Sequence, residues 1–141
     1  MASSDQFMGG KSSARTQWIE GGAAGSHGAM RVQGEIKAGS PYPWAGVMFS
    51  PGGAPMQAVD LRKREAIRLR IRGTPGDYVL VLLTGQGMPA SVRINVQEQW
   101  QEVRVALQDV PGADLSAVMA FGVTNNRVGA FQFDIDDVHL D

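Results

Sequence analysis

The chain has 141 residues, 43% of them hydrophobic, which fits one compact domain that can bury a substantial apolar core without a disulfide or metal staple. Its 13 lysines and arginines against 14 aspartates and glutamates give a net charge of −1, so no overall field attracts nucleic acid or an anionic membrane. The absence of cysteine excludes thiol nucleophiles, thiolate zinc sites and disulfides.

The sequence shows no targeting or membrane-spanning segment. The first ten residues have neither a basic region nor an apolar stretch, so we expect no signal peptide. The longest apolar run, Tyr78 to Leu83, has six residues, far fewer than the about 20 that a transmembrane helix needs. We therefore expect a soluble chain that is either cytoplasmic or a module cut from an exported protein.

Alternation of apolar and polar residues predicts β-strands along the whole chain. It is clearest where Ile67, Leu69 and Ile71 alternate with arginines, which indicates a half-buried strand. Residues 77–84 are apolar at both parities, which is typical of a central strand covered on each face. In chain order, the first three predicted strands are a strand that contains Trp18, a strand over residues 30–36 and a strand that begins at residues 42–44. The other six cover residues 67–71, 77–84, 92–96, 103–107, 117–123 and 130–140.

Clusters of glycine, proline and asparagine separate these strands, and no window of eleven residues has a clean helical period. The sequence therefore predicts an all-β sandwich over residues 1–141, with eight or nine antiparallel strands and little helix.

The last predicted strand contains an irregularity. Its apolar residues occupy odd positions up to Ile135 and even positions from Val138 onward. One extra residue in a strand moves an apolar set to the other face, so we predict a β-bulge at Asp136 and Asp137. Because Asp136 shares the parity of Val138, we expect its carboxylate to point inward, where it needs a partner.

Five short motifs occur in a fixed order over nearly the whole chain. They are Ser4-Asp5 followed by Met8-Gly9-Gly10 and Ser12; Trp44-Ala45-Gly46; Asp60-Leu61; Arg72-Gly73 with Tyr78; and Gly129 to Phe131 leading into Ile135-Asp136-Asp137-Val138 with Leu140. In these motifs the chain resembles the complex I intermediate-associated protein 30 family, a galactose-binding-like jelly roll related to carbohydrate-binding modules. The resemblance implies a jelly-roll sandwich that binds without catalysing a reaction.

The resemblance leaves two functions open. One is carbohydrate binding, as in related modules that accompany hydrolases, and the other is protein interaction, as in an assembly factor. It also implies a metal site: in related modules an acidic residue in the final strand, with groups from the N-terminal loop, holds a structural calcium ion. Asp136 and Asp5 are the predicted ligands, and backbone N–H groups or water are the alternative partners.

Two groups of residues are candidate ligand contacts. Tyr42 and Trp44 offer flat rings that match the C–H faces of pyranoses, although aromatic rings also close the ends of sandwiches. Asn125, Asn126 and Arg127 gather planar donors and acceptors at a strand end, although asparagine also suits tight turns.

The other polar and aromatic features favour structural roles. We expect Trp18 to pack, and we expect the row of arginines at 68, 70 and 72 to be a solvated face paired with acids across strands. The chain has two histidines without arranged partners, and the adjacent Asp136 and Asp137 face opposite sides of a strand. We therefore expect no catalytic centre.

Overall fold

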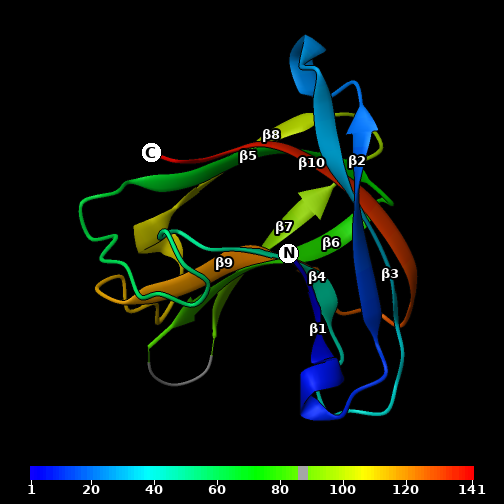
Figure 1. The fold of residues 1–141 in the computed structure, drawn as a ribbon, viewed down its shortest axis with the longest axis horizontal. Coiled ribbons are helices and arrows are strands. Elements are labelled where there is room, and N and C mark those ends of the chain that lie inside the picture. The colour runs from blue at the N-terminus through cyan, green and yellow to red at the C-terminus, as the bar shows by residue number, and fades with distance from the viewer. Residues whose placement is uncertain (86–88) are drawn as a thin grey trace.

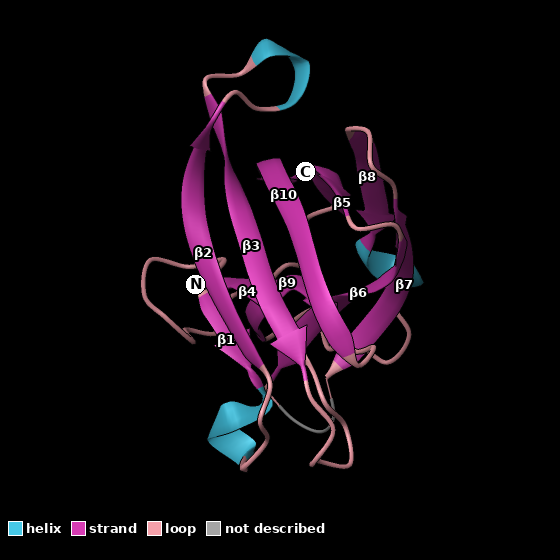
Figure 2. Ribbon diagram, turned by 90° about the vertical axis from the view of Figure 1, so that its right-hand side faces the viewer, coloured by secondary structure: helices cyan, strands magenta, loops and turns pink. Residues whose placement is uncertain are grey.

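The computed structural model describes residues 1–85 and 89–141, apart from the side chain of Phe7. Within these residues, two antiparallel sheets of five strands each pack face to face, as Figures 1 and 2 show. The all-β sandwich prediction is confirmed, with ten strands in place of eight or nine.

The first sheet has the order β1-β4-β9-β6-β7, and the second has the order β2-β3-β10-β5-β8. The first sheet comprises β1 (Ala2–Ser4), β4 (Ala45–Phe49), β9 (Val118–Asn125), β6 (Gly76–Thr84) and β7 (Ala90–Val96). The second comprises β2 (Ser13–Glu20), β3 (Gly28–Ile36), β10 (Gly129–Leu140), β5 (Ala66–Gly73) and β8 (Gln101–Ala106). Three short 3-10 helices lie in the connections: η1 (Asp5–Met8), η2 (Ala23–Gly25) and η3 (Leu107–Asp109). None of the described helices is long and apolar enough to cross a bilayer.

The core lies between the facing sides of the two sheets. In β5 the predicted alternation is confirmed, because Ile67, Leu69 and Ile71 are buried while the intervening arginines stay half-exposed on the outer face. From the opposite sheet, β6 contributes Tyr78, which is fully buried and donates a hydrogen bond from its hydroxyl to the carbonyl of Thr74 at 2.9 Å. Apolar burial of this kind is the main stabilising contribution to a sandwich of this size.

The predicted bulge in β10 is confirmed, but the predicted orientation of Asp136 is wrong. The pairing of β10 with β5 shifts register between Asp136 and His139, and Asp137 has a positive φ of 57°. Asp136 lies before the shift and pairs with Arg70, whose side chain is on the outer face. The extra residue comes after Asp136, so this carboxylate keeps the parity of Asp134 and points outward.

The β2–β3 hairpin extends past the end of the neighbouring strand and carries η2 at its tip (Figure 2). Trp18 lies in β2, in register with Met30, which itself pairs with Ile135 of β10. Trp18 is 67% exposed, so the prediction that it packs is wrong. Its register partner Met30 is at the edge of the core. The indole ring lies over Gly28, where an added Cβ would meet the ring at 2.0 Å. An alternating pattern cannot tell whether the opposite sheet reaches far enough to cover a given strand end.

Candidate ligand-binding groove

An open groove of about 490 Å³ runs over the outer face of the first sheet. Val79, Val81 and Leu83 of β6 line it, together with Met48 of β4 and Thr124 of β9. The prediction that β6 is covered on both faces is therefore half right: its inner face is buried, whereas its outer face is only partly buried and borders the groove. An antiparallel sheet with an apolar outer strip is unusual, since such sheets commonly turn polar residues to water.

The segment before β4 borders the groove with aromatic and proline side chains. Tyr42 and Trp44 both line it, and Tyr42 is 77% exposed. Pro41 and Pro43 alternate with the two aromatics and restrict the backbone of this segment. The structure thus brings both predicted aromatic residues to one cavity beside the apolar strip of β6.

Asp5 joins the N-terminal segment to this aromatic segment. Its carboxylate is 1% exposed and accepts hydrogen bonds from the backbone N–H and the hydroxyl of Ser12 at 3.0 and 3.2 Å, and from the backbone N–H of Trp44 at 3.2 Å. The Ser40 hydroxyl lies at 3.4 Å from the same carboxylate. The backbone N–H of Asp5 donates to the carbonyl of Trp44 at 3.0 Å. These contacts fix the backbone that carries the groove aromatics, a role that the sequence analysis did not assign to Asp5.

The three candidate residues at the end of β9 and in the loop after it lie in different surroundings. Asn126 lines the groove. Asn125 is buried, and its side-chain oxygen accepts the backbone N–H of Arg127 at 2.8 Å, which is a turn-forming contact. The guanidinium of Arg127 donates to the carbonyl of Pro75 at 3.3 Å and does not line the groove. Of the three, Asn126 alone joins Tyr42 and Trp44 in one cavity.

The groove is apolar and carries no charge among the described residues that line it. Its polar side chains are hydroxyls, the Asn126 amide, and the Tyr42 and Trp44 ring groups. Three methionines, Met8, Met48 and Met56, also line it, and Met8 and Met56 are at least half-exposed. Such a surface favours an uncharged ligand, because a charge buried there would lack a partner.

The two predicted calcium ligands lie in separate hydrogen-bond networks. Asp136 accepts hydrogen bonds from the backbone N–H of Ala23 at 3.0 Å and from the hydroxyl of Ser26 at 2.6 Å, in the β2–β3 turn. Asp5 binds Ser12, the residue just before β2, at the end of this strand away from the β2–β3 turn. No group of three or more histidine or acidic residues able to hold a metal occurs within the described part of the chain. Both carboxylates accept hydrogen bonds from the protein, and the shared calcium site stays a prediction.

The outer face of the second sheet is polar and paired. Asp134 is 3% exposed and accepts hydrogen bonds from Arg31 at 2.8 Å and Arg72 at 3.0 Å. Burial raises the pKa of Asp134, but the hydrogen bonds from the two guanidinium groups outweigh it and hold this pKa below its ordinary value. Arg72 also lies over the ring of Trp100, at 4.7 Å from its centroid. Arg68 also pairs with Asp141 at 3.0 Å and Arg70 with Glu102 at 3.5 Å, so the prediction of an arginine row paired with acids is confirmed.

Comparison with known proteins agrees with this architecture. No model of a known protein family and no curated protein matches the sequence. Among solved structures, the family 11 carbohydrate-binding module from Clostridium thermocellum, solved with a beta-1,3-1,4-mixed-linked tetrasaccharide, is similar with a TM-score of 0.72 at 15% identity, covering 99% of this chain and 86% of that one. The family 30 module of a cellulosomal cellulase of the same organism has a TM-score of 0.69 at 14% identity, covering 89% and 81%.

An exo-beta-agarase structure also contains a similar region, with a TM-score of 0.65 at 12% identity over 92% of this chain and 22% of that chain. At such identities the likeness establishes the fold. The chain has the β-sandwich fold of carbohydrate-binding modules.

Proposed function

We propose that this protein is a non-catalytic binding module that holds a neutral carbohydrate chain in the groove of the first sheet. The observation that carries the proposal is the position of Tyr42 and Trp44 beside the exposed apolar strip of β6. Sugar rings have apolar C–H faces that pack on aromatic and aliphatic side chains, and hydroxyls that pair with groups such as Thr124 and Asn126. The carbohydrate-binding modules of the same fold support this class of ligand.

Calorimetric titration with a mixed-linked beta-1,3-1,4-glucan and a panel of other neutral glycans tests the proposal. We expect one of them to bind, and we expect Trp44→Ala and Tyr42→Ala each to weaken that binding by about tenfold or more, which corresponds to about 1.4 kcal/mol for one lost ring contact. Trp18→Ala is the matched control, since Trp18 is exposed but does not line the groove. Equal weakening by all three variants, or no binding to any glycan, contradicts the proposal.

A protein partner is the second candidate for the same groove. The observation that favours it is the set of three methionines, because flexible thioether side chains adapt to apolar protein surfaces. The sequence motifs that resemble the complex I intermediate-associated protein 30 family imply the same alternative, but no family model matches the chain. A blank glycan panel, together with one protein that co-purifies with the wild-type chain and not with Trp44→Ala, would establish this alternative.

A further inference from the structure

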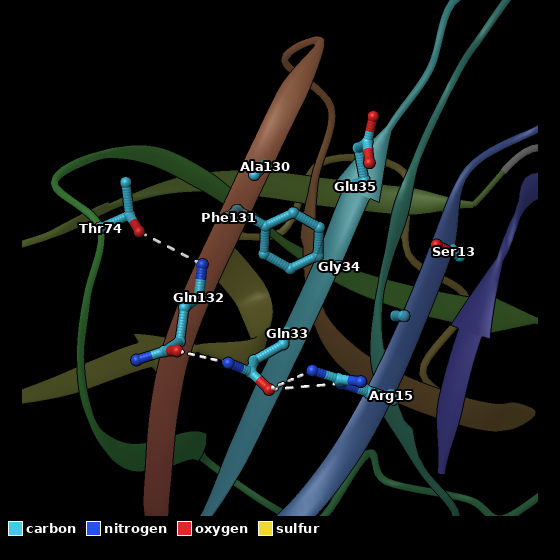
Figure 3. A pocket seen from close by; sticks show the side chains of 10 residues that line it. Ser13, Arg15, Gln33, Gly34, Glu35, Thr74, Ala130, Phe131 and Gln132 are labelled. Carbon is cyan, nitrogen blue, oxygen red and sulfur yellow. Dashed lines mark hydrogen bonds between the residues drawn. The ribbon is translucent and has the colours of Figure 1, made fainter.

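The outer face of the second sheet, opposite the groove, contains two adjoining hollows that both polar and apolar groups line. The first, of about 570 Å³, lies over β2, β3 and the start of β10 and is shown in Figure 3. The second, of about 430 Å³, lies toward β5 and the loop after β7. Thr74 and Gln132 line both. The two hollows therefore form one trough across the sheet, which we call the outer trough.

A chain of hydrogen bonds fixes the side chains at the centre of the outer trough. Cross-strand register places Arg15, Gln33 and Gln132 in one row. Arg15 donates to the Gln33 side-chain oxygen at 3.3 Å from Nε and 3.1 Å from Nη2, and the Gln33 side-chain nitrogen donates to the Gln132 side-chain oxygen at 2.7 Å. Thr74 holds the backbone of Gln132, whose N–H donates to the threonine hydroxyl at 3.2 Å. Figure 3 shows these contacts as dashed lines.

The direction of this chain follows from arginine chemistry. A guanidinium group only donates, so Gln33 must turn its oxygen to Arg15 and its nitrogen to Gln132. Gln132 must then accept with its oxygen, and its amide N–H₂ group points away from Gln33, as Figure 3 shows. This group donates to no residue in the part of the chain that the structure describes. A charged donor at one end polarises the chain and strengthens the donor at the other.

Unpaired acceptors lie on either side of this donor. Glu35 lines the first hollow and Glu98 the second; both are exposed, and neither side chain makes a hydrogen bond or ion pair with a described residue. The charged residues that line the two hollows balance. They are three arginines, Arg15, Arg31 and Arg72, and three acids, Glu35, Glu98 and Asp134. A trough with no net charge, a central donor and flanking acceptors suits a neutral ligand whose hydroxyls both donate and accept.

We propose that the outer trough is a second binding site for a neutral, hydroxyl-rich chain, with the Gln132 amide as its central hydrogen-bond donor. The choice of a sugar chain as the ligand rests on the proposed function of the groove. Because Arg72 covers Trp100, the trough offers hydrogen bonds and little ring stacking, and it binds more weakly than the groove. Two sites on opposite sheets let one module hold two separate chains.

The test follows the side-chain amide signals of Gln33 and Gln132 by nuclear magnetic resonance in a Trp44→Ala background. The probes are the mixed-linked beta-1,3-1,4 tetrasaccharide, glucose, galactose and mannose at millimolar concentration. We expect one of them to shift both amide signals while the groove is impaired.

Gln132→Glu is the decisive variant, because it keeps an oxygen that accepts from Gln33 and replaces the outward N–H₂ by a negatively charged oxygen that cannot donate. We expect it to abolish the shift at Gln33 with an unchanged melting temperature, whereas Gln108→Ala, on an exposed residue of η3, leaves the shift intact.

The outcomes separate this site from the groove. Binding that Trp44→Ala abolishes without any shift at Gln33 or Gln132 overturns the outer trough and leaves the groove standing. Shifts at Gln132 that survive in Trp44→Ala, in a protein whose groove binds no glycan, support the trough alone. No amide shift with any of the four sugars overturns the trough.

Discussion

Removal of the Asp5 carboxylate is the perturbation whose cost can be worked out most directly. Asp5→Ala removes the acceptor of the buried backbone N–H of Ser12 and of the partly buried backbone N–H of Trp44. Each such orphaned donor costs about 1–3 kcal/mol, and we expect the variant to lower the free energy of unfolding by about 3 kcal/mol. That loss is a large fraction of the free energy of unfolding of a typical domain, which is about 5–15 kcal/mol.

Urea denaturation followed by circular dichroism measures this change, and a thermal scan should show a melting temperature lower by about 10 °C. Asp60→Ala is the control: Asp60 is exposed, and its carboxylate contacts Arg62 two residues away, so we expect no measurable change in the urea midpoint. Equal midpoints for Asp5→Ala and Asp60→Ala would refute the structural role of Asp5. A further loss of groove affinity in Asp5→Ala, measured below its melting transition, would show that Asp5 also holds the aromatic segment in place.

Three further expectations follow from the same contacts. The pKa of Asp134 is depressed, so its pairs with Arg31 and Arg72 contribute their full stabilisation above the ordinary carboxyl pKa of 3.8 and lose it as the pH falls through the lower pKa of the folded state. Asp134→Asn should therefore flatten the acid side of a plot of unfolding free energy against pH. An unchanged acid side would contradict this reasoning. A chelator should leave the melting temperature of the wild type unchanged, because the carboxylates of Asp5 and Asp136 already accept hydrogen bonds from protein groups. If a chelator lowers the melting temperature and added calcium restores it, the metal site is supported. Tyr78→Phe should cost about 2 kcal/mol in urea denaturation, since it removes the buried hydroxyl that bonds both the Thr74 carbonyl and the Asn125 side chain. A neutral result would show that water replaces it.

The fold could be predicted from the sequence because strand alternation is a local signal. The apolar residues of β5 and the change of parity in β10 mark which side chains are buried and where the bulge lies, without knowledge of any partner strand. The orientation of Asp136 could not be predicted, since a bulge of one residue can precede or follow a given position in the same pattern. The exposure of Trp18 also depends on how far the opposite sheet extends.

The candidate site shows the same division. Of the five ligand contacts that the sequence predicts, Tyr42, Trp44 and Asn126 line the groove, whereas Asn125 and Arg127 do not. The two apolar faces of β6 are a further signal of the groove, but the pattern by itself indicates burial on both sides. Whether an apolar face is covered by protein or open to a ligand depends on sheet order and loop position, which no local pattern encodes. Tertiary structure also decided the role of Asp5, because its partners come from two other segments of the chain. The sequence therefore determined the strands and their buried faces through local periodicity, while the groove, the hydrogen bonds of Asp5 and the outer trough arise from contacts between distant segments.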